Sequence, residues 1–225
     1  MRGERLLTAV ERVVEDCDDL IAHVETLKSA ANEIRDEDDL REHLAHQIIH
    51  GYSTRSAIAG GVTSLPALLP GAGSAVALFG GLLADMTYML KHDVEMILCL
   101  SYLYGYDIRD EKERWLAYVL AGIRTYEVQV RRNYFADLFD LQLDALPKYT
   151  PRELFKLAAS VLGKVALVSV SRGFVKTLPL VGIAVSASTN KFTTWSVGWW
   201  CVEALERRRN AERNEERPTV DAFVQ

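Results

Sequence analysis

Three histidines that share one helical face are the residues of this chain best placed to do chemistry. His43, His46 and His50 are separated by three and four residues, so a helix places all three on one side. A pair four residues apart, such as His46 and His50, can bind zinc through two imidazole nitrogens. A zinc protease would need glutamate directly after the first histidine of the pair, and this chain has Gln47 there.

A metal site at His46 and His50 would therefore need a third ligand from another part of the chain. The acids that folding could bring there are Asp85, Asp93 and Glu95. We expect a polar or partly buried histidine face instead, and predict no metal ion. A metal enzyme built on His46, His50 and one of these acids is the last of the alternatives considered below.

Other catalytic signatures do not occur in the sequence. The segment from Gly71 to Val76 begins like a dinucleotide-binding loop, but valine stands where the third glycine is needed and no strand precedes it. There is no phosphate-binding Walker loop and no Gly-x-Ser-x-Gly motif. We predict no cofactor and no catalytic residue.

A long uncharged stretch dominates the organisation of the chain. No charged residue interrupts the 29 residues of segment 56–84. Two prolines within it disfavour a single straight helix, because proline lacks a backbone donor and restricts the preceding residue. The stretch therefore predicts two short apolar helical arms joined by an elbow. The residues assigned to this first elbow are Gly60, Gly61, Pro66, Pro70, Gly71 and Gly73.

A second segment, 177–190, repeats this pattern of proline followed by small residues. Pro179, Gly182 and Asn190 mark it, and we expect the two elbow elements to pack together at the centre of the fold. Asp85 ends the uncharged stretch. Its carboxylate is either buried against a partner such as Asn190, Thr194 or Lys191, or exposed at a rim.

The remaining periodicity is helical, which predicts an all-α, multi-helix bundle of six to eight helices around the two Pro/Gly-kinked elements. We expect a long amphipathic helix over 6–34 and a second one that ends near Gly51. A third runs from about 73 to 104, and capping signals at Asp110 and at Thr150 with Glu153 start the next two. The last helix starts after Pro179 and frays into a charged tail.

Composition and charge disfavour some classes of protein for this chain. The chain has 49% apolar and 25% charged residues, which disfavours a polytopic membrane protein, and its net charge of −5 gives no reason to expect nucleic-acid binding. Residues 1–50 hold 13 acids and 6 bases, whereas residues 148–191 hold 7 bases and 1 acid. The basic region could face an anionic lipid surface, or the two regions could pack together. Three cysteines without a CxxC spacing fit a reducing cytoplasm, and we see no export signal.

Several of these motifs together resemble the EcsC protein family. They are Gly60-Gly61-Val-Thr-Ser-Leu-Pro66, then Tyr104-Gly105-Tyr106-Asp107, then Pro179 with Gly182, Ser186 and Asn190. Serine at 186 and alanine after Pro66 depart from the family, which commonly has glycine at both places. The resemblance covers roughly 48–205 and implies a bacterial helical protein without implying a reaction. We divide the chain into N-terminal amphipathic helices over 1–50, an EcsC-like domain over 51–208 and a polar tail over 209–225.

Two functions fit these features better than an enzyme does. The first is a cytoplasmic, non-catalytic protein that binds lipid at the inner face of the membrane through the elbows and the tryptophans Trp195 and Trp199. The second is a soluble scaffold whose elbows are core and whose first helix or charged tail meets a protein partner. We favour the first, and the sequence leaves the oligomeric state open.

Overall fold

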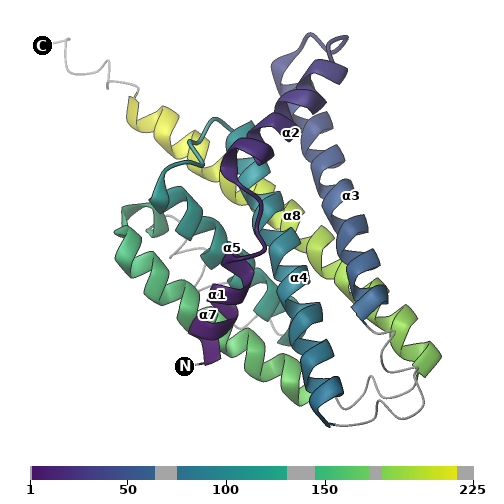
Figure 1. The fold of residues 1–225 in the computed structure, drawn as a ribbon. Coiled ribbons are helices and arrows are strands. Elements are labelled where there is room, and N and C mark those ends of the chain that lie inside the picture. Colours follow the sequence, from purple (N-terminus) through teal and green to yellow (C-terminus); the bar gives the residue numbers. More distant parts are fainter. Residues whose placement is uncertain (1, 64–74, 131–144, 173–178, 217–225) are drawn as a thin grey trace, which may run out of the picture.

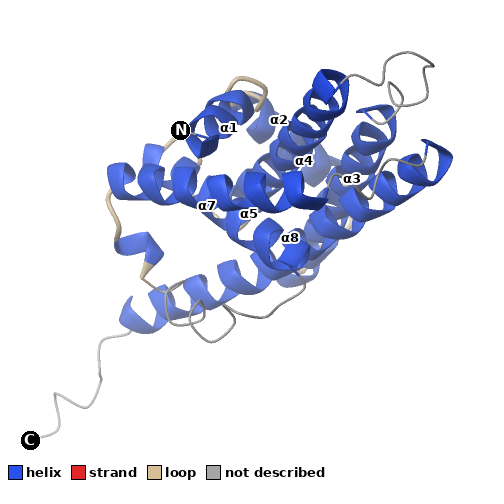
Figure 2. Ribbon diagram, turned by 90° about the horizontal axis from the view of Figure 1, so that it is seen from below, coloured by secondary structure: helices blue, strands red, loops and turns tan. Residues whose placement is uncertain are grey.

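The computed structural model describes residues 2–63, 75–130, 145–172 and 179–216, and every regular element in these ranges is helical. Figure 2 shows them as a bundle without a strand in the described part, which confirms the prediction of an all-α fold. The elements are α1 (Arg2–Glu11), α2 (Cys17–Ala30), α3 (Glu37–Thr63), α4 (Ala75–Leu103), α5 (Glu111–Val130), the short 3-10 helix η2 (Leu146–Lys148), α7 (Pro151–Arg172) and α8 (Pro179–Glu216).

Helix α4 is the centre of the bundle. It packs against α1, α2, α3, α5, α7 and α8, and Figure 1 shows it running through the middle of the molecule. Because neighbours cover it on several sides, consecutive residues of its second half are buried, including Met96, Ile97 and Leu100 with no exposed surface. A helix that is apolar all round is expected in such a position.

Helices α3 and α8 form a long antiparallel pair. Asp38, near the start of α3, lies 3.7 Å from Arg209 near the end of α8. Further along, a Cβ at Gly198 would come within 2.6 Å of Ile49, so this position needs glycine for the two helices to approach. Gly198 and Asn190 lie eight residues apart on α8, and both are buried.

The prediction of one long helix over 6–34 is wrong. The chain leaves α1 after Glu11 and starts α2 at Cys17, where the Asp16 carboxylate accepts a hydrogen bond from the Asp18 N–H. Between the two helices the backbone N–H of Glu15 donates to the Glu95 carboxylate of α4 at 2.8 Å. Heptad spacing continues through the break because both helices bury the same kind of apolar face, so periodicity alone does not reveal it.

Two helices were predicted to end near a glycine, and the structure confirms only one of these ends. The helix expected to end at Gly51 continues through it to Thr63, because Gly51 has helical neighbours on both sides and nothing in the structure requires a turn there. Gly105, in contrast, has a φ of +95°, a conformation that favours glycine, and it ends α4 as predicted.

The predicted caps start the helices that were expected. The Asp110 carboxylate accepts the Lys112 N–H at 3.0 Å before α5. Thr150 and Glu153 form a reciprocal capping box before α7, with Pro151 as the first helical residue. Glu113 does not complete a similar box at α5, because it forms a two-pronged ion pair with Arg208 of α8 at 2.7 and 2.8 Å.

The tips of both predicted elbows lie outside the described residues. These include Pro66, Pro70, Gly71 and Gly73, so the packing of the two elbows on each other stays a prediction. The flanking residues do fall on helices: Gly60 and Gly61 in α3, Asp85 in α4, and Pro179 and Gly182 at the start of α8. In the part of the chain that the structure describes, no helix combines the length and apolarity needed to span a membrane.

Candidate functional site

A group of charged residues lies inside the bundle on α4. Lys91, His92, Asp93 and Glu95 stand within an otherwise apolar helix. Because α4 is central, two of them, Asp93 and Glu95, have no exposed surface. Buried carboxylates are costly unless they are paired or protonated, so each needs a physical explanation.

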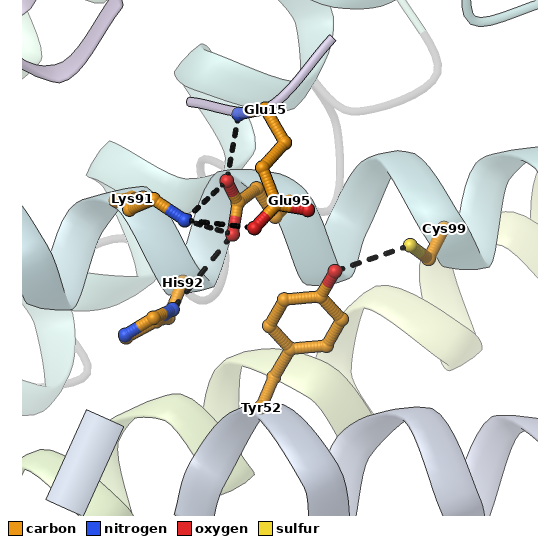
Figure 3. A network of polar contacts seen from close by, with 6 residues as sticks. All are labelled: Glu15, Tyr52, Lys91, His92, Glu95 and Cys99. Carbon is orange, nitrogen blue, oxygen red and sulfur yellow. Dashed lines mark hydrogen bonds and ion pairs between the residues drawn. The ribbon is translucent and has the colours of Figure 1, made fainter. Parts of the chain in front are cut away.

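Glu95 is held by contacts from three directions, shown in Figure 3. The backbone N–H of Glu15 donates to one carboxylate oxygen at 2.8 Å. The Lys91 ammonium, one helical turn away, lies 2.7 and 2.8 Å from the two oxygens. The His92 imidazole Nδ1 lies 3.8 Å from the second oxygen, and the Glu15 carboxylate contacts Lys91 at 3.3 Å.

These contacts decide the charge of Glu95. Burial alone would raise its pKa, but the contacts with His92 and Lys91 and the hydrogen bond from Glu15 together outweigh burial and lower the pKa. Glu95 is therefore an anion in the folded protein, and it fixes the α1–α2 junction on the central helix.

Tyr52 of α3 extends the cluster toward Cys99. The Tyr52 hydroxyl and the Cys99 sulfur are 3.5 Å apart. The centroid of the Tyr52 ring lies 6.3 Å from that of His23 and 6.3 Å from that of His92. Burial raises the pKa of Cys99 to about 12, and it also raises the pKa of Tyr52. Both groups are protonated at neutral pH, so Cys99 is a buried thiol and not an activated nucleophile.

Asp93 lies on another side of α4, and its contacts differ from those of Glu95. Thr125 of α5 donates a hydrogen bond to its Oδ2 at 2.9 Å, and Thr194 of α8 lies beside it. Its Oδ1 has no hydrogen-bond partner among the described residues. Burial raises the pKa of Asp93 to about 7, against the opposing effect of the two threonines. This carboxyl is thus poised between its neutral and charged forms at physiological pH.

The buried polar side chains of α4 connect this helix to its neighbours. Its acids and its thiol have no exposed surface, and the cleft described next is lined by none of them. Catalysis would require these groups to reach a substrate. We interpret the cluster as a polar clamp that joins α3, α4 and the α1–α2 junction.

A cleft of about 560 Å³ opens on the surface between the first half of α3 and the second half of α8. Its floor contains apolar and aromatic side chains, namely Ala45, Val202, Tyr104 and Trp199. Acids and arginines from both helices form its rim. Figure 1 shows the two helices separating toward the upper side of the view.

An aromatic strip continues from this cleft along α8. We use this name for Phe192, Trp195 and Trp199, which are spaced by three and four residues and so share one face. The rings of Trp195 and Trp199 have centroids 6.4 Å apart, and His46 of α3 meets Trp199 at 6.1 Å. Phe192 is 61% exposed and Trp195 is 47% exposed, which is unusual for such large apolar side chains.

The two candidate metal ligands, His46 and His50, lie beside this strip. Their rings are exposed and stacked with centroids 6.4 Å apart. Within the described residues, no group of three or more His, Cys, Asp and Glu side chains could hold a metal ion. Of the acids considered as a third ligand, Glu95 contacts His92 in the clamp and Asp93 contacts Thr125, whereas the side chain of Asp85 lies outside the described part of the structure.

The structure brings together only some of the residues selected from the sequence. Trp195 and Trp199 meet on the surface, whereas Asn190 is buried on another face of the same helix. Thr194, considered as a partner of Asp85, lies beside Asp93. Sequence reasoning missed the role of Lys91 and Glu95. The available signal was a pair of opposite charges four residues apart inside an apolar helix.

Comparison of the chain with protein-family models, with curated proteins and with solved structures found no match.

Proposed function

We propose that this chain is a non-catalytic protein that binds an anionic membrane surface with one end of its helical bundle. The observation that carries the proposal is the exposure of large apolar side chains at that end. Phe192 and Trp195 on α8 and Ile58 on α3, which is 62% exposed, all face solvent. Tryptophan and phenylalanine gain free energy on entering the interfacial layer of a bilayer.

These residues belong to the same end of the molecule. Ile58 follows His50 by two helical turns, and His50 stacks on His46, which contacts Trp199. Since α3 and α8 are antiparallel, moving along α3 toward Ile58 corresponds to moving along α8 toward Phe192. Figure 1 shows that the end of α7 and the start of α4 point to this side as well.

The charge at this end favours an anionic surface. In the helical segments that meet here, the charged residues whose side chains the structure describes are all basic. They are Arg55, Lys164 and Lys191. Basic side chains near apolar ones add roughly 1 kcal/mol each to binding of an anionic membrane.

Two elements that could have met a protein partner are used within the chain. Helix α1 buries Leu6, Leu7 and Val10 and packs on α7 and α4. The charged part of α8 is tied to the core through Arg208 and Glu113. These contacts favour lipid binding over the scaffold function. The resemblance to the EcsC family, which we keep as a proposal, is compatible with either.

Vesicle flotation tests the proposal. The chain is mixed with vesicles of phosphatidylcholine alone or of phosphatidylcholine with phosphatidylglycerol, and floated through a density gradient. We expect binding only when the anionic lipid is present. A double variant with Phe192→Ala and Trp195→Ala should bind on the order of tenfold more weakly, because each truncation removes apolar area that would leave water.

The matched control is Tyr149→Ala. Tyr149 is also an exposed aromatic residue, but it precedes α7 at the opposite end of that helix. The control should float as the unmodified chain does. Absence of binding to both kinds of vesicle, or equal binding by the double variant, would rule out the proposal.

A further inference from the structure

The cleft between α3 and α8 has the size of a small-molecule site and a mainly charged lining. Its volume of about 560 Å³ is within the range of small-molecule pockets. Ala45 and Val202 supply an apolar floor, and Trp199 supplies an aromatic ring at one end. Tyr104 is already engaged, because Arg41 lies 5.6 Å from its ring and its hydroxyl donates to Glu206 at 3.1 Å. Trp199, whose ring also contacts those of His46 and Trp195, is the other aromatic residue of the cleft.

The arginines of the cleft gather at its other end, around Asp38. Arg41 forms an ion pair with Asp38, and Arg209 lies 3.7 Å away. The hydrogen bond and the charge of Arg41, together with the charges of Arg209 and Arg213, lower the pKa of Asp38. Arg41 and Arg209 are therefore close to Asp38.

Glu42 of α3 and Glu203 of α8 stand on opposite walls of the cleft, each one helical turn from the level at which His46 contacts Trp199. Glu42 precedes His46 by one helical turn, and Glu203 follows Trp199 by one turn. Since His46 contacts Trp199 and the two helices are antiparallel, the two acids lie at the same level of the cleft. Both carboxylates are exposed, and among the residues that line the cleft the five acids outnumber the three arginines, so its lining is acidic on balance.

We infer that this cleft binds an organic cation: an ammonium or guanidinium group on an apolar stem. The charged group lies between Glu42 and Glu203 against the ring of Trp199, and the stem lies on Ala45 and Val202. Carboxylates and an indole ring both attract cations, and an apolar floor accommodates a methylene chain. The same chemistry is present in a free polyamine and in a lysine side chain of a partner protein. This site is independent of the membrane-binding end.

Isothermal titration calorimetry with two probes tests the inference and separates the two sources. One probe is spermidine and the other is a blocked Lys-Leu-Lys peptide amide, each titrated at low and at physiological salt. We expect saturable binding of one probe molecule per chain, weaker at the higher salt. Tighter binding of spermidine identifies a free amine as the ligand, and tighter binding of the peptide identifies a lysine side chain.

Two double variants distinguish binding in the cleft from attraction of the probes to the negative charge of the whole chain. Glu42→Gln with Glu203→Gln should weaken binding on the order of tenfold, because two carboxylate contacts to the cation are lost. The control, Asp19→Asn with Glu33→Gln, removes the same charge from exposed positions outside the cleft and should change binding less than about twofold. Circular dichroism confirms that both variants are folded.

Two results would overturn the inference. One is the absence of saturable heat for both probes at millimolar concentration. The other is equal weakening by the cleft variant and by the control, which would show that the probes respond to net charge alone.

Discussion

The Glu95 carboxylate accepts a hydrogen bond from the backbone N–H of Glu15 at 2.8 Å, across a separation of 80 residues. This contact joins the central helix to the junction between α1 and α2. It explains in one interaction why the N-terminal region is two helices and not one. A carboxylate without exposed surface can hold this position because Lys91 neutralises it at 2.7 Å.

We predict that Glu95→Ala destabilises the fold by about 3 kcal/mol, because it leaves the Glu15 N–H without its acceptor and the partly buried Lys91 ammonium with only the longer contact to the Glu15 carboxylate. Urea unfolding followed by circular dichroism measures this. The control is Glu25→Ala, which removes an exposed ion pair with Lys28 and should cost under about 1 kcal/mol. Equal effects of the two variants would show that the Glu95 contacts do not hold the junction.

Acid should also weaken this contact. Because the folded protein lowers the pKa of Glu95, its contribution to stability is present above the ordinary glutamate pKa of 4.5. It is lost as the pH falls through the lower value of the folded state. In Glu95→Gln the loss of stability on acidification should be smaller than in the unmodified chain, as measured by urea unfolding at a series of pH values. An unchanged pH dependence would contradict this prediction.

Asp93 should have the opposite pH dependence. Its pKa is about 7 in the folded protein against an ordinary value of 3.8, so the folded state binds the proton more tightly than the unfolded state does. Stability contributed by this group therefore falls as the pH rises from about 4 to about 7, by up to roughly 4 kcal/mol. Asp93→Asn, which is neutral at every pH, should lack this fall.

Urea unfolding of the two proteins across this pH range checks the Asp93 prediction. The difference between their curves isolates Asp93 from the other acids. Asp19→Asn, at an exposed position, is the control and should follow the unmodified chain. A constant difference between the Asp93→Asn protein and the unmodified chain at all pH values would mean that Asp93 does not titrate in this range.

Gly3→Ala should detach α1 from α7. A Cβ at Gly3 would lie 2.0 Å from the Ala159 carbonyl oxygen and 2.9 Å from the Gly163 nitrogen, and backbone atoms cannot move aside as side chains do. We expect a loss of about 2 to 3 kcal/mol in the free energy of unfolding. Gly51→Ala is the matched control, since no atom lies within 4 Å of its added Cβ. It should stabilise α3 by about 0.5 to 1 kcal/mol. Equal stabilities would contradict the close approach at Gly3.

Fluorescence quenching by brominated lipids should locate the membrane contact. With anionic vesicles that contain brominated acyl chains, we expect quenching of the tryptophan emission, because Trp195 is exposed at the proposed binding end. Trp195→Phe should remove most of the quenching. Trp115→Phe should not, because Trp115 packs against Phe155 on another part of the bundle. Full quenching in Trp195→Phe would place the membrane contact elsewhere.

Local features of the chain could be predicted from the sequence. The helix starts at Asp110 and Thr150 and the stop at Gly105 depend on groups a few residues apart, so their side-chain and backbone chemistry is visible in the sequence. The all-α class followed from apolar periodicity for the same reason. The aromatic residues Trp195 and Trp199 were also identified, since spacing places them on one helical face.

Contacts between distant segments could not be predicted in this way. Helical spacing shows that Lys91 and Glu95 share a face, but it does not show that the Glu15 N–H is the third partner. The spacing also does not show that the Glu113 carboxylate pairs with Arg208, which is 95 residues away. Nor does the sequence show that Glu42 and Glu203 face one cleft.

The sequence by itself thus determined which segments are helical and which faces are apolar, because these depend on interactions within a few turns of the backbone. Only the tertiary structure decided which acids are buried, how they are neutralised and which apolar residues stay in water. Burial depends on which helices pack together, and desolvation then sets the charge of Asp93 and of Glu95 in opposite directions.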